Sequence, residues 1–142
     1  MKARVKWIEG MSFLTESGSG HAVVVDGAPE AGGRNLGPRP MEMVLMGTGG
    51  CTSFDVMMIL KKSRADVRGC EVDITAERAE TDPKVFTKIH MHFTVTGHQL
   101  KPDVVKRAID LSAEKYCSAS IMLGATAEIT HDFKLVEVGS SQ

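Results

Sequence analysis

Short runs of alternating hydrophobic and polar residues open the chain. They cover Ala3–Ile8, Ser12–Glu16 and His21–Asp26, and Gly10 and the Ser-Gly run at 17–20 separate them as turns. This pattern predicts an antiparallel meander of three strands. A Gly- and Pro-rich stretch follows at 27–40. It predicts a long mobile loop, and such loops inside a compact domain more often serve a function than merely connect elements.

The next segment, Met41–Leu60, carries hydrophobic residues on nearly every face of a helix. Pro40 suits the first turn of a helix, and the cations that follow Leu60 complement the helix dipole at its end. Because a helix that is apolar all round is a buried helix, we expect this one in the core. Glu42, Asp55 and three glycines interrupt the segment, which is therefore typical of a core helix rather than a membrane span.

The rest of the chain alternates between strand and helix patterns. The predicted elements are strands at 70–80 and 85–97, a helix at 101–116 with an apolar continuation at 117–123, and a last strand at 127–138. A turn sequence at 81–84 joins the first two of these strands as a hairpin. The order of elements predicts a single α+β domain spanning residues 1–142.

Composition and charge narrow the classes of function. The chain has 142 residues, of which 42% are hydrophobic and 25% charged, which is ordinary for one globular domain. Its net charge is −1 and Lys and Arg do not cluster, which argues against a dedicated nucleic-acid binder. We expect a cytoplasmic location, because the N-terminus lacks a signal-peptide pattern and the three cysteines suggest a reducing compartment.

The cysteines are the candidate reactive groups. They are spaced by 19 and 47 residues without a Cys-x-x-Cys motif, so neither a zinc ribbon nor a thioredoxin-type site is supported. Cys51 directly follows Gly47-Thr48-Gly49-Gly50. If these glycines break the helix, Cys51 begins the next turn, where free N–H groups lower the pKa of its thiol. The alternative, which the pattern alone favours, is a buried cysteine that fills space. By themselves, Cys70 and Cys117 are also interpreted as structural.

Two other patterns indicate binding sites only weakly. His90 and His92 share one face of a strand, but no third ligand is evident nearby, and solvated histidines are typical of such a face. The glycines at 47–50 lack the preceding strand and the following Lys-Ser/Thr of a phosphate-binding loop. We therefore expect no metal and no cofactor.

Two motifs carry a resemblance to a known family. The segment PMEMVLMGTGGC at Pro40–Cys51 and the segment DLSAEKYC at Asp110–Cys117 resemble the OsmC/Ohr family, and most closely its small YhfA-type, OsmC-like branch. The resemblance covers nearly the whole chain. It implies an OsmC-like fold with antiparallel strands around a long buried helix, and an intertwined homodimer. It also implies a thiol-dependent peroxidase with Cys51 as the peroxidatic cysteine and Cys117 as the resolving cysteine.

The chain departs from the family's pattern at an acidic position. Better-characterised members place a glutamate ten residues before the reactive cysteine, where this chain has Met41, while Glu42 lies nine residues before Cys51. Nine residues correspond to about 180° around a regular helix, so Glu42 would face away from Cys51 unless the glycines bend or unwind the helix. Glu42 is therefore a candidate catalytic residue only if the helix is irregular, and we expect slow peroxide reduction otherwise.

The second departure concerns an activating arginine. The family uses one from the N-terminal hairpin region, but this chain has no arginine between Arg4 and Arg34. Arg34 and Arg39, both in the Gly- and Pro-rich stretch, are the candidate substitutes.

Two hypotheses for the function follow. In the first, the Cys51 thiolate attacks an organic hydroperoxide, becomes a sulfenic acid and condenses with Cys117 to a disulfide that an external dithiol reduces. In the second, the same apolar cavity holds a small hydrophobic or electrophilic ligand without turnover, and the chain is a binding or sensing protein. The expected partners are a second copy of the chain, a hydroperoxide and a dithiol reductant, with no nucleic acid and no membrane.

Overall fold

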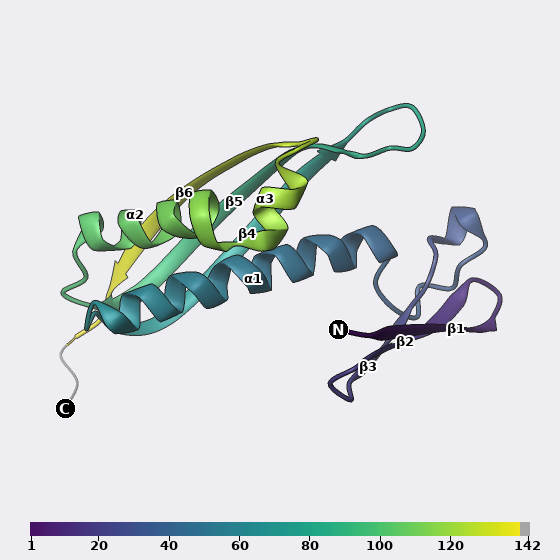
Figure 1. Cartoon of the computed structure of the whole chain (residues 1–142), viewed down its shortest axis with the longest axis horizontal. Helices are drawn as coiled ribbons and strands as arrows, with labels where there is room; N and C mark the ends of the chain where they lie inside the picture. Colours follow the sequence, from purple (N-terminus) through teal and green to yellow (C-terminus); the bar gives the residue numbers. More distant parts are fainter. Residues whose placement is uncertain (140–142) are drawn as a thin grey trace. The chain divides into compact units, whose positions relative to one another are not determined.

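Two three-stranded sheets and several helices make up the described part of the structure. The computed structural model describes residues 1–139, which form two compact units divided between Met46 and Gly47. Each unit contains one of the sheets (Figure 1). The α+β class that the sequence predicts is confirmed.

The first unit begins with the predicted antiparallel meander. Strands β1 (Ala3–Glu9), β2 (Ser12–Ser17) and β3 (Ala22–Val25) pair in chain order, and each lies within two residues of its predicted bounds. Gly10 turns the chain from β1 to β2 with a φ of 54°, a conformation that glycine adopts without the cost that a Cβ would add.

The Gly- and Pro-rich stretch after β3 folds around one buried carboxylate. The side chain of Asp26 accepts hydrogen bonds from the backbone N–H groups of Gly27, Arg34 and Leu36, at 2.7, 3.1 and 3.2 Å. Burial on its own raises the pKa of Asp26, but these three donors outweigh burial and lower it. A Cβ at Gly33 would lie 1.8 Å from the carbonyl oxygen of Gly27, so only glycine fits there. This loop, which includes a short 3₁₀ turn η1 (Pro29–Ala31), is thus organised from within.

The sheet of the second unit combines antiparallel and parallel pairs. Strands β4 (Asp66–Arg78) and β5 (Phe86–His98) form the predicted hairpin, and β6 (Glu128–Glu137) pairs with β5 in parallel. Strand β4 begins four residues earlier than predicted, because the chain pairs with β5 on both sides of an irregularity between Val67 and Gly69. Gly69, which directly precedes the predicted strand start at Cys70, therefore lies at a bulge.

Helices cover one face of this sheet. Helix α1 (Pro40–Lys62) runs from the first unit into the second, and α2 (Pro102–Leu111), a π-helical turn η2 (Ser112–Tyr116) and α3 (Ser118–Leu123) connect β5 to β6. Parallel strands need such a crossover of a dozen or more residues. In Figure 1, α1 and α2 lie along the same side of the sheet.

The core of the second unit lies between these helices and the sheet. Alternate residues of β5, from Ile89 to Val95, are at most 1% exposed, as their alternation with His90 and His92 predicts. Fully or almost fully buried partners come from α1 and α2: Val56, Leu60, Val105, Ala108 and Ile109.

Helix α1 differs from the helix that the sequence predicts. Its buried residues, among them Thr52, Val56 and Leu60, follow a four-residue spacing along one face. The opposite face exposes hydrophobic side chains, including Phe54 at 68% and Met58 at 44%. The expectation of a helix buried on every side is therefore not met within one chain. By length and composition α1 is apolar enough to cross a membrane, but one face of it packs into the core of the fold.

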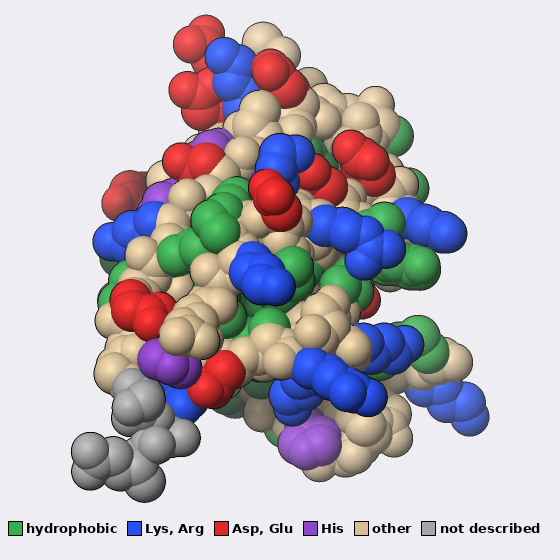
Figure 2. All heavy atoms as spheres, turned by 90° about the vertical axis from the view of Figure 1, so that its left-hand side faces the viewer, with side chains coloured by type: hydrophobic (Ala, Val, Ile, Leu, Met, Phe, Trp, Pro, Cys, Tyr) green, Lys and Arg blue, Asp and Glu red, His purple; other side chains and the backbone are tan. Residues whose placement is uncertain are grey.

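Charges of both signs are mixed on the surface. Figure 2 shows Lys, Arg, Asp and Glu side chains, with hydrophobic side chains between them, on the face that it draws. This mixture accords with the net charge of −1.

Candidate functional site

The structure brings two of the three cysteines together. The sulfur atoms of Cys51 and Cys117 and a carboxylate oxygen of Asp55 all lie within 4.8 Å of one another. All three cysteines are present as free thiols, and Cys70 lies on β4 outside this group. The pairing of Cys51 with Cys117 that the family resemblance implies therefore has a geometric counterpart in this chain.

Helix α1 holds Cys51 in its middle. The helix continues without a break through Gly47, Gly49 and Gly50, so the condition under which Cys51 would begin a new helical turn is not met. Gly49 allows close packing, because a Cβ at this position would lie 2.7 Å from Cδ1 of Ile74 on β4. The small residue lets α1 approach the sheet closely at the level of Cys51.

A change in helix type places Cys117. The π-helical turn η2 ends at Tyr116. The next residue, Cys117, has an extended backbone with φ −76° and ψ 99°, and α3 begins directly after it. The Cys117 sulfur accepts a hydrogen bond from the backbone N–H of Ser120 at 3.4 Å and so caps α3. Its own N–H donates to the carbonyl of Ser112 at 2.8 Å. These contacts fix a side chain that is fully buried.

A hydrogen-bond network connects the two cysteine-bearing segments. The Ser112 hydroxyl lies 2.8 Å from the Thr52 hydroxyl and donates to the Asp55 carboxylate at 3.2 Å. Thr52 and Asp55 are the neighbours of Cys51 on α1, whereas Ser112 begins the turn that leads to Cys117. The network therefore holds the two segments in one arrangement.

The surroundings of Cys51 favour its thiolate. The backbone N–H of Ala119, in the first turn of α3, donates to the sulfur and is the main cause that lowers the pKa of Cys51. Partial burial opposes this, but the Cys117 thiol and the Ser118 hydroxyl, whose oxygen lies 4.0 Å from the sulfur, also lower the pKa. The negative charge of Asp55 raises it. The net direction is downward, which increases the thiolate fraction near neutral pH.

The other two cysteines shift in the opposite direction. Burial is the main cause that raises the pKa of Cys117, and a negative charge on Cys51 raises it further. Burial likewise raises the pKa of Cys70. The pair thus consists of one sulfur that ionises readily and one that keeps its proton and donates it in a hydrogen bond.

Two further predicted site residues, Glu42 and Arg39, lie in the first unit at the start of α1. The Glu42 carboxylate accepts a hydrogen bond from the backbone N–H of Arg39 at 2.8 Å, which caps the helix. The Arg39 guanidinium donates to the side chain of Asn35 at 2.8 Å and to the carbonyl of Gly37 at 3.3 Å.

The other candidate arginine also has a partner of its own. Arg34 pairs with Glu9 at 2.6 Å within the first unit. The catalytic role of Arg34, Arg39 and Glu42 stays a prediction.

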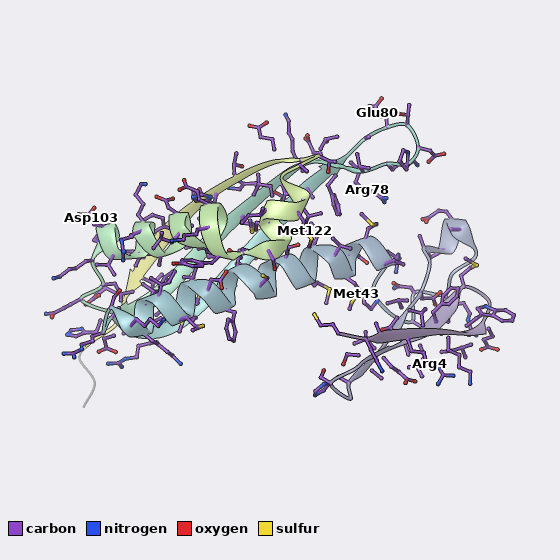
Figure 3. All side chains as sticks on the ribbon, viewed as in Figure 1. Arg4, Met43, Arg78, Glu80, Asp103 and Met122 are labelled. Carbon is purple, nitrogen blue, oxygen red and sulfur yellow. The ribbon has the colours of Figure 1, made fainter. Side chains whose placement is uncertain are left out.

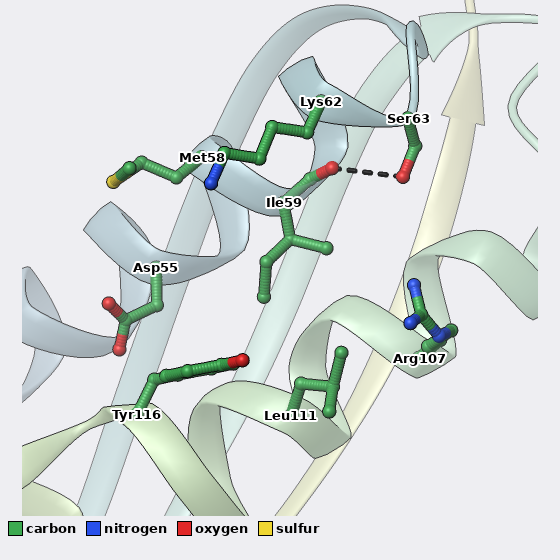
Figure 4. A pocket seen from close by; sticks show the side chains of 8 residues that line it. All are labelled: Asp55, Met58, Ile59, Lys62, Ser63, Arg107, Leu111 and Tyr116. Carbon is green, nitrogen blue, oxygen red and sulfur yellow. Dashed lines mark hydrogen bonds between the residues drawn. The ribbon is translucent and has the colours of Figure 1, made fainter.

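A pocket of about 450 Å³ has residues of α1, α2 and η2 in its wall. Asp55 belongs both to the cysteine group and to the wall of this pocket (Figure 4). The rest of the wall is largely apolar, with two cations and two hydroxyls: Met58, Ile59, Lys62, Ser63, Arg107, Leu111 and Tyr116. The pocket therefore suits a molecule with an apolar portion.

Sequence reasoning missed the polar partners of the cysteines. Asp55 had a recognisable signal, because it lies four residues after Cys51 and such residues share a helix face. Ser112 and Ala119 had none, since only the fold brings them to α1. The histidines fit the expectation of a polar sheet face: His90 and His92 both contact the Asp132 carboxylate, at 3.0 and 2.7 Å.

Comparison with known proteins finds similarity along most of the chain. The family described as OsmC-like protein matches residues 32–132. Protein YhfA of Escherichia coli strain K12 is 54% identical over 136 residues, which cover 96% of this chain and 98% of that protein. A hypothetical protein from Aquifex aeolicus VF5 shares 26% identity, with a TM-score of 0.79 and coverage of 94% and 96%. The organic hydroperoxide resistance protein OhrB of Bacillus subtilis has a TM-score of 0.63 at 17% identity, with coverage of 94% and 98%, and is similar in fold.

Proposed function

Because the chain belongs to the OsmC-like protein family, we propose that it reduces organic hydroperoxides through a Cys51 sulfenic acid and a Cys51–Cys117 disulfide. The observation that carries this proposal is the asymmetric cysteine pair, in which the pKa of Cys51 is lowered and that of Cys117 is raised. The name of the Bacillus subtilis relative in fold, an organic hydroperoxide resistance protein, supports this class of substrate.

The proposed reaction starts at the more exposed sulfur. The Cys51 thiolate attacks one oxygen of the hydroperoxide, the O–O bond breaks, and the alkoxide leaves as an alcohol after taking a proton. The sulfur, now oxidised by two electrons, carries the transferred oxygen as a sulfenic acid. The hydrogen bonds from Ala119 and Ser118 hold the reacting sulfur while it is negatively charged.

Cys117 then closes the cycle. Its thiol loses a proton and its sulfur attacks the sulfur of Cys51, which releases water and forms the disulfide. The two sulfurs start within 4.8 Å and must approach to about 2 Å. An external dithiol returns both cysteines to thiols by exchange. We propose the cytoplasm as the location, since a reducing compartment supplies such dithiols.

The pocket beside Asp55 accounts for an organic substrate. Its apolar wall, including Met58, Leu111 and Tyr116, can contact the alkyl group of an organic hydroperoxide, and hydrogen peroxide has no such group. A small hydrophobic or electrophilic ligand fits the same pocket, which is the observation that favours the rival hypothesis of a binding or sensing protein.

We also propose that the protein is a homodimer. Hydrophobic side chains stay exposed on α1 and α3, with Phe54 at 68%, Ile121 at 50% and Met122 at 70% (Figure 3 for Met122). A second copy of the chain is the simplest cover for such a surface, since most oligomers of soluble proteins are symmetric homo-oligomers.

Peroxide consumption with a dithiol tests the function. We expect multiple turnovers of an alkyl hydroperoxide with dithiothreitol, at a rate above that of hydrogen peroxide. Cys51→Ser should abolish peroxide consumption, and Cys70→Ser should leave it unchanged. In Cys117→Ser, when no other thiol is present, the reaction should stop once Cys51 has become a sulfenic acid. Stoichiometric binding of an apolar ligand without any turnover would favour the binding or sensing hypothesis.

A further inference from the structure

We propose that the reduced cluster of Cys51, Asp55 and Cys117 binds one thiophilic divalent cation, with Zn²⁺ as the representative. This goes beyond peroxide reduction, because it concerns a metal-bound state of the free thiols. The three ligand atoms all lie within 4.8 Å of one another. Within residues 1–139, this is the one group of three or more His, Cys, Asp or Glu residues that has such spacing.

The spacing is close to that of a tetrahedral site. With Zn–S bonds of about 2.3 Å and Zn–O bonds of about 2.0–2.2 Å, two ligand atoms of a tetrahedron lie roughly 3.4–3.8 Å apart. The atoms of the cluster therefore need to approach by no more than about 1.4 Å. Side-chain rotation supplies that distance. Three protein ligands leave the fourth position open, and Cys51 and Asp55 are partly exposed, so a cation has a way in.

Helix geometry and hydrogen bonds hold the three ligand residues in place. Cys51 and Asp55 are four residues apart on α1, which places both on one face of the helix. Cys117 is fixed at the start of α3 by the Ser120 N–H. The Ser112 hydroxyl donates to the Asp55 carboxylate and so orients the oxygen ligand, a kind of support that metal sites commonly have.

The donor set selects the cation. Two thiolates and one carboxylate suit Zn²⁺ and Cd²⁺, whereas Mg²⁺ and Ca²⁺ prefer oxygen ligands alone. The sheet-face group of His90, His92 and Asp132 lacks this geometry, since both histidines converge on one oxygen of Asp132.

Binding exchanges protons for the cation without electron transfer. Each cysteine that is a thiol beforehand loses its proton to water as its sulfur binds the metal. The bound site, with two thiolates and one carboxylate, keeps a net charge of −1. Both sulfurs of the proposed redox pair then bind the metal, so the metal-bound form does not react with peroxide. Conversely, oxidation to the disulfide removes two of the three ligands.

Titration of the full-length reduced protein tests the proposal without any peroxide. We expect one equivalent of Zn²⁺ per chain in competition with a chromophoric chelator, and a thiolate-to-metal charge-transfer band with Cd²⁺. The Cys70→Ser and Asp73→Asn variants, which change β4 outside the cluster, should bind as the unchanged chain does. Cys51→Ser and Cys117→Ser should lose tight binding, and Asp55→Asn should weaken it by at least about tenfold.

A second test of metal binding uses the protein of unchanged sequence and needs no variants. Protein oxidised to the disulfide should bind no Zn²⁺ tightly, and reduction should restore one equivalent. Absence of stoichiometric binding to the reduced chain, equal affinity in Asp55→Asn, or loss of binding in Cys70→Ser would overturn the proposal. These outcomes do not involve turnover, so they are distinct from a failure of the peroxidase assay.

Discussion

The Ser112 hydroxyl donates a hydrogen bond to the Asp55 carboxylate across 3.2 Å, and this contact links the turn before Cys117 to the helix that carries Cys51. Ser112 is fully buried, as is the hydroxyl of Thr52 that lies 2.8 Å from it. The contact is part of the framework that sets the separation of the two sulfurs.

Removing this hydroxyl should loosen the site. Ser112→Ala leaves the buried Thr52 hydroxyl without its partner, which costs about 1–3 kcal/mol of the free energy of unfolding. Urea denaturation measures the loss. The control is Ser63→Ala, because the Ser63 hydroxyl bonds to the Ile59 carbonyl at the exposed end of α1 and its removal should cost roughly 0.5 kcal/mol or less. Equal losses in the two variants would show that the network adds no stability.

The reactivity of Cys51 should follow pH in a specific way. Because the pKa of Cys51 is lowered, the rate of its alkylation by iodoacetamide should reach half its maximum below the pH that is typical of a free cysteine. Asp55→Asn removes a charge that raises this pKa, so the midpoint should move further down. Cys117→Ala removes a donor to the thiolate, so the midpoint should move up. Midpoints that move in the opposite directions would contradict the description of the site.

Glu42→Gln should have little effect on peroxide consumption. In the structure the Glu42 carboxylate accepts the Arg39 N–H at the start of α1, and a glutamine oxygen can accept the same hydrogen bond. Initial rates with an alkyl hydroperoxide and dithiothreitol provide the measurement. If the substitution abolishes fast turnover, Glu42 has the role of the glutamate that other members of the family place one residue earlier.

The exposed face of α1 should be covered by a second chain. Sedimentation at micromolar concentration should give the mass of a dimer, and Phe54→Asp should shift the protein toward the monomer because it puts a charge on that face. Val85→Asp, at another exposed hydrophobic side chain near the β4–β5 turn, serves as the control and should leave the dimer intact. A folded, unassociated monomer of the unchanged chain would contradict the dimer.

The strands were predictable because their patterns are local. Alternation on β5 identified both the buried residues, such as Phe93, and the partly exposed His90 and His92 before any pairing was known. The end of α2 was not predictable, since the residues of η2 have ordinary helical spacing and the change to a π-helical turn follows from packing. The sequence therefore predicted one helix to Tyr116, where the structure has two types of helix.

The site was predictable only in part, because tertiary packing rather than a local pattern brings its residues together. The family resemblance pointed to Cys51 and Cys117, which are 66 residues apart in the chain, and no local pattern relates them. Glycines before Cys51 suggested a helix break, but Gly49 instead allows close packing against Ile74, a contact made by a strand far along the chain. The donors that lower the pKa of Cys51 come from α3 and became evident only in the fold.

Disulfide mapping is the most direct test of the proposal that Cys51 and Cys117 form the redox pair. The reduced protein is treated with one equivalent of an alkyl hydroperoxide, free thiols are blocked, and the digest is analysed by mass spectrometry. We expect a bridge between Cys51 and Cys117, with Cys70 recovered as a blocked thiol. A bridge that contains Cys70, or three blocked thiols after the peroxide has been consumed, would contradict it.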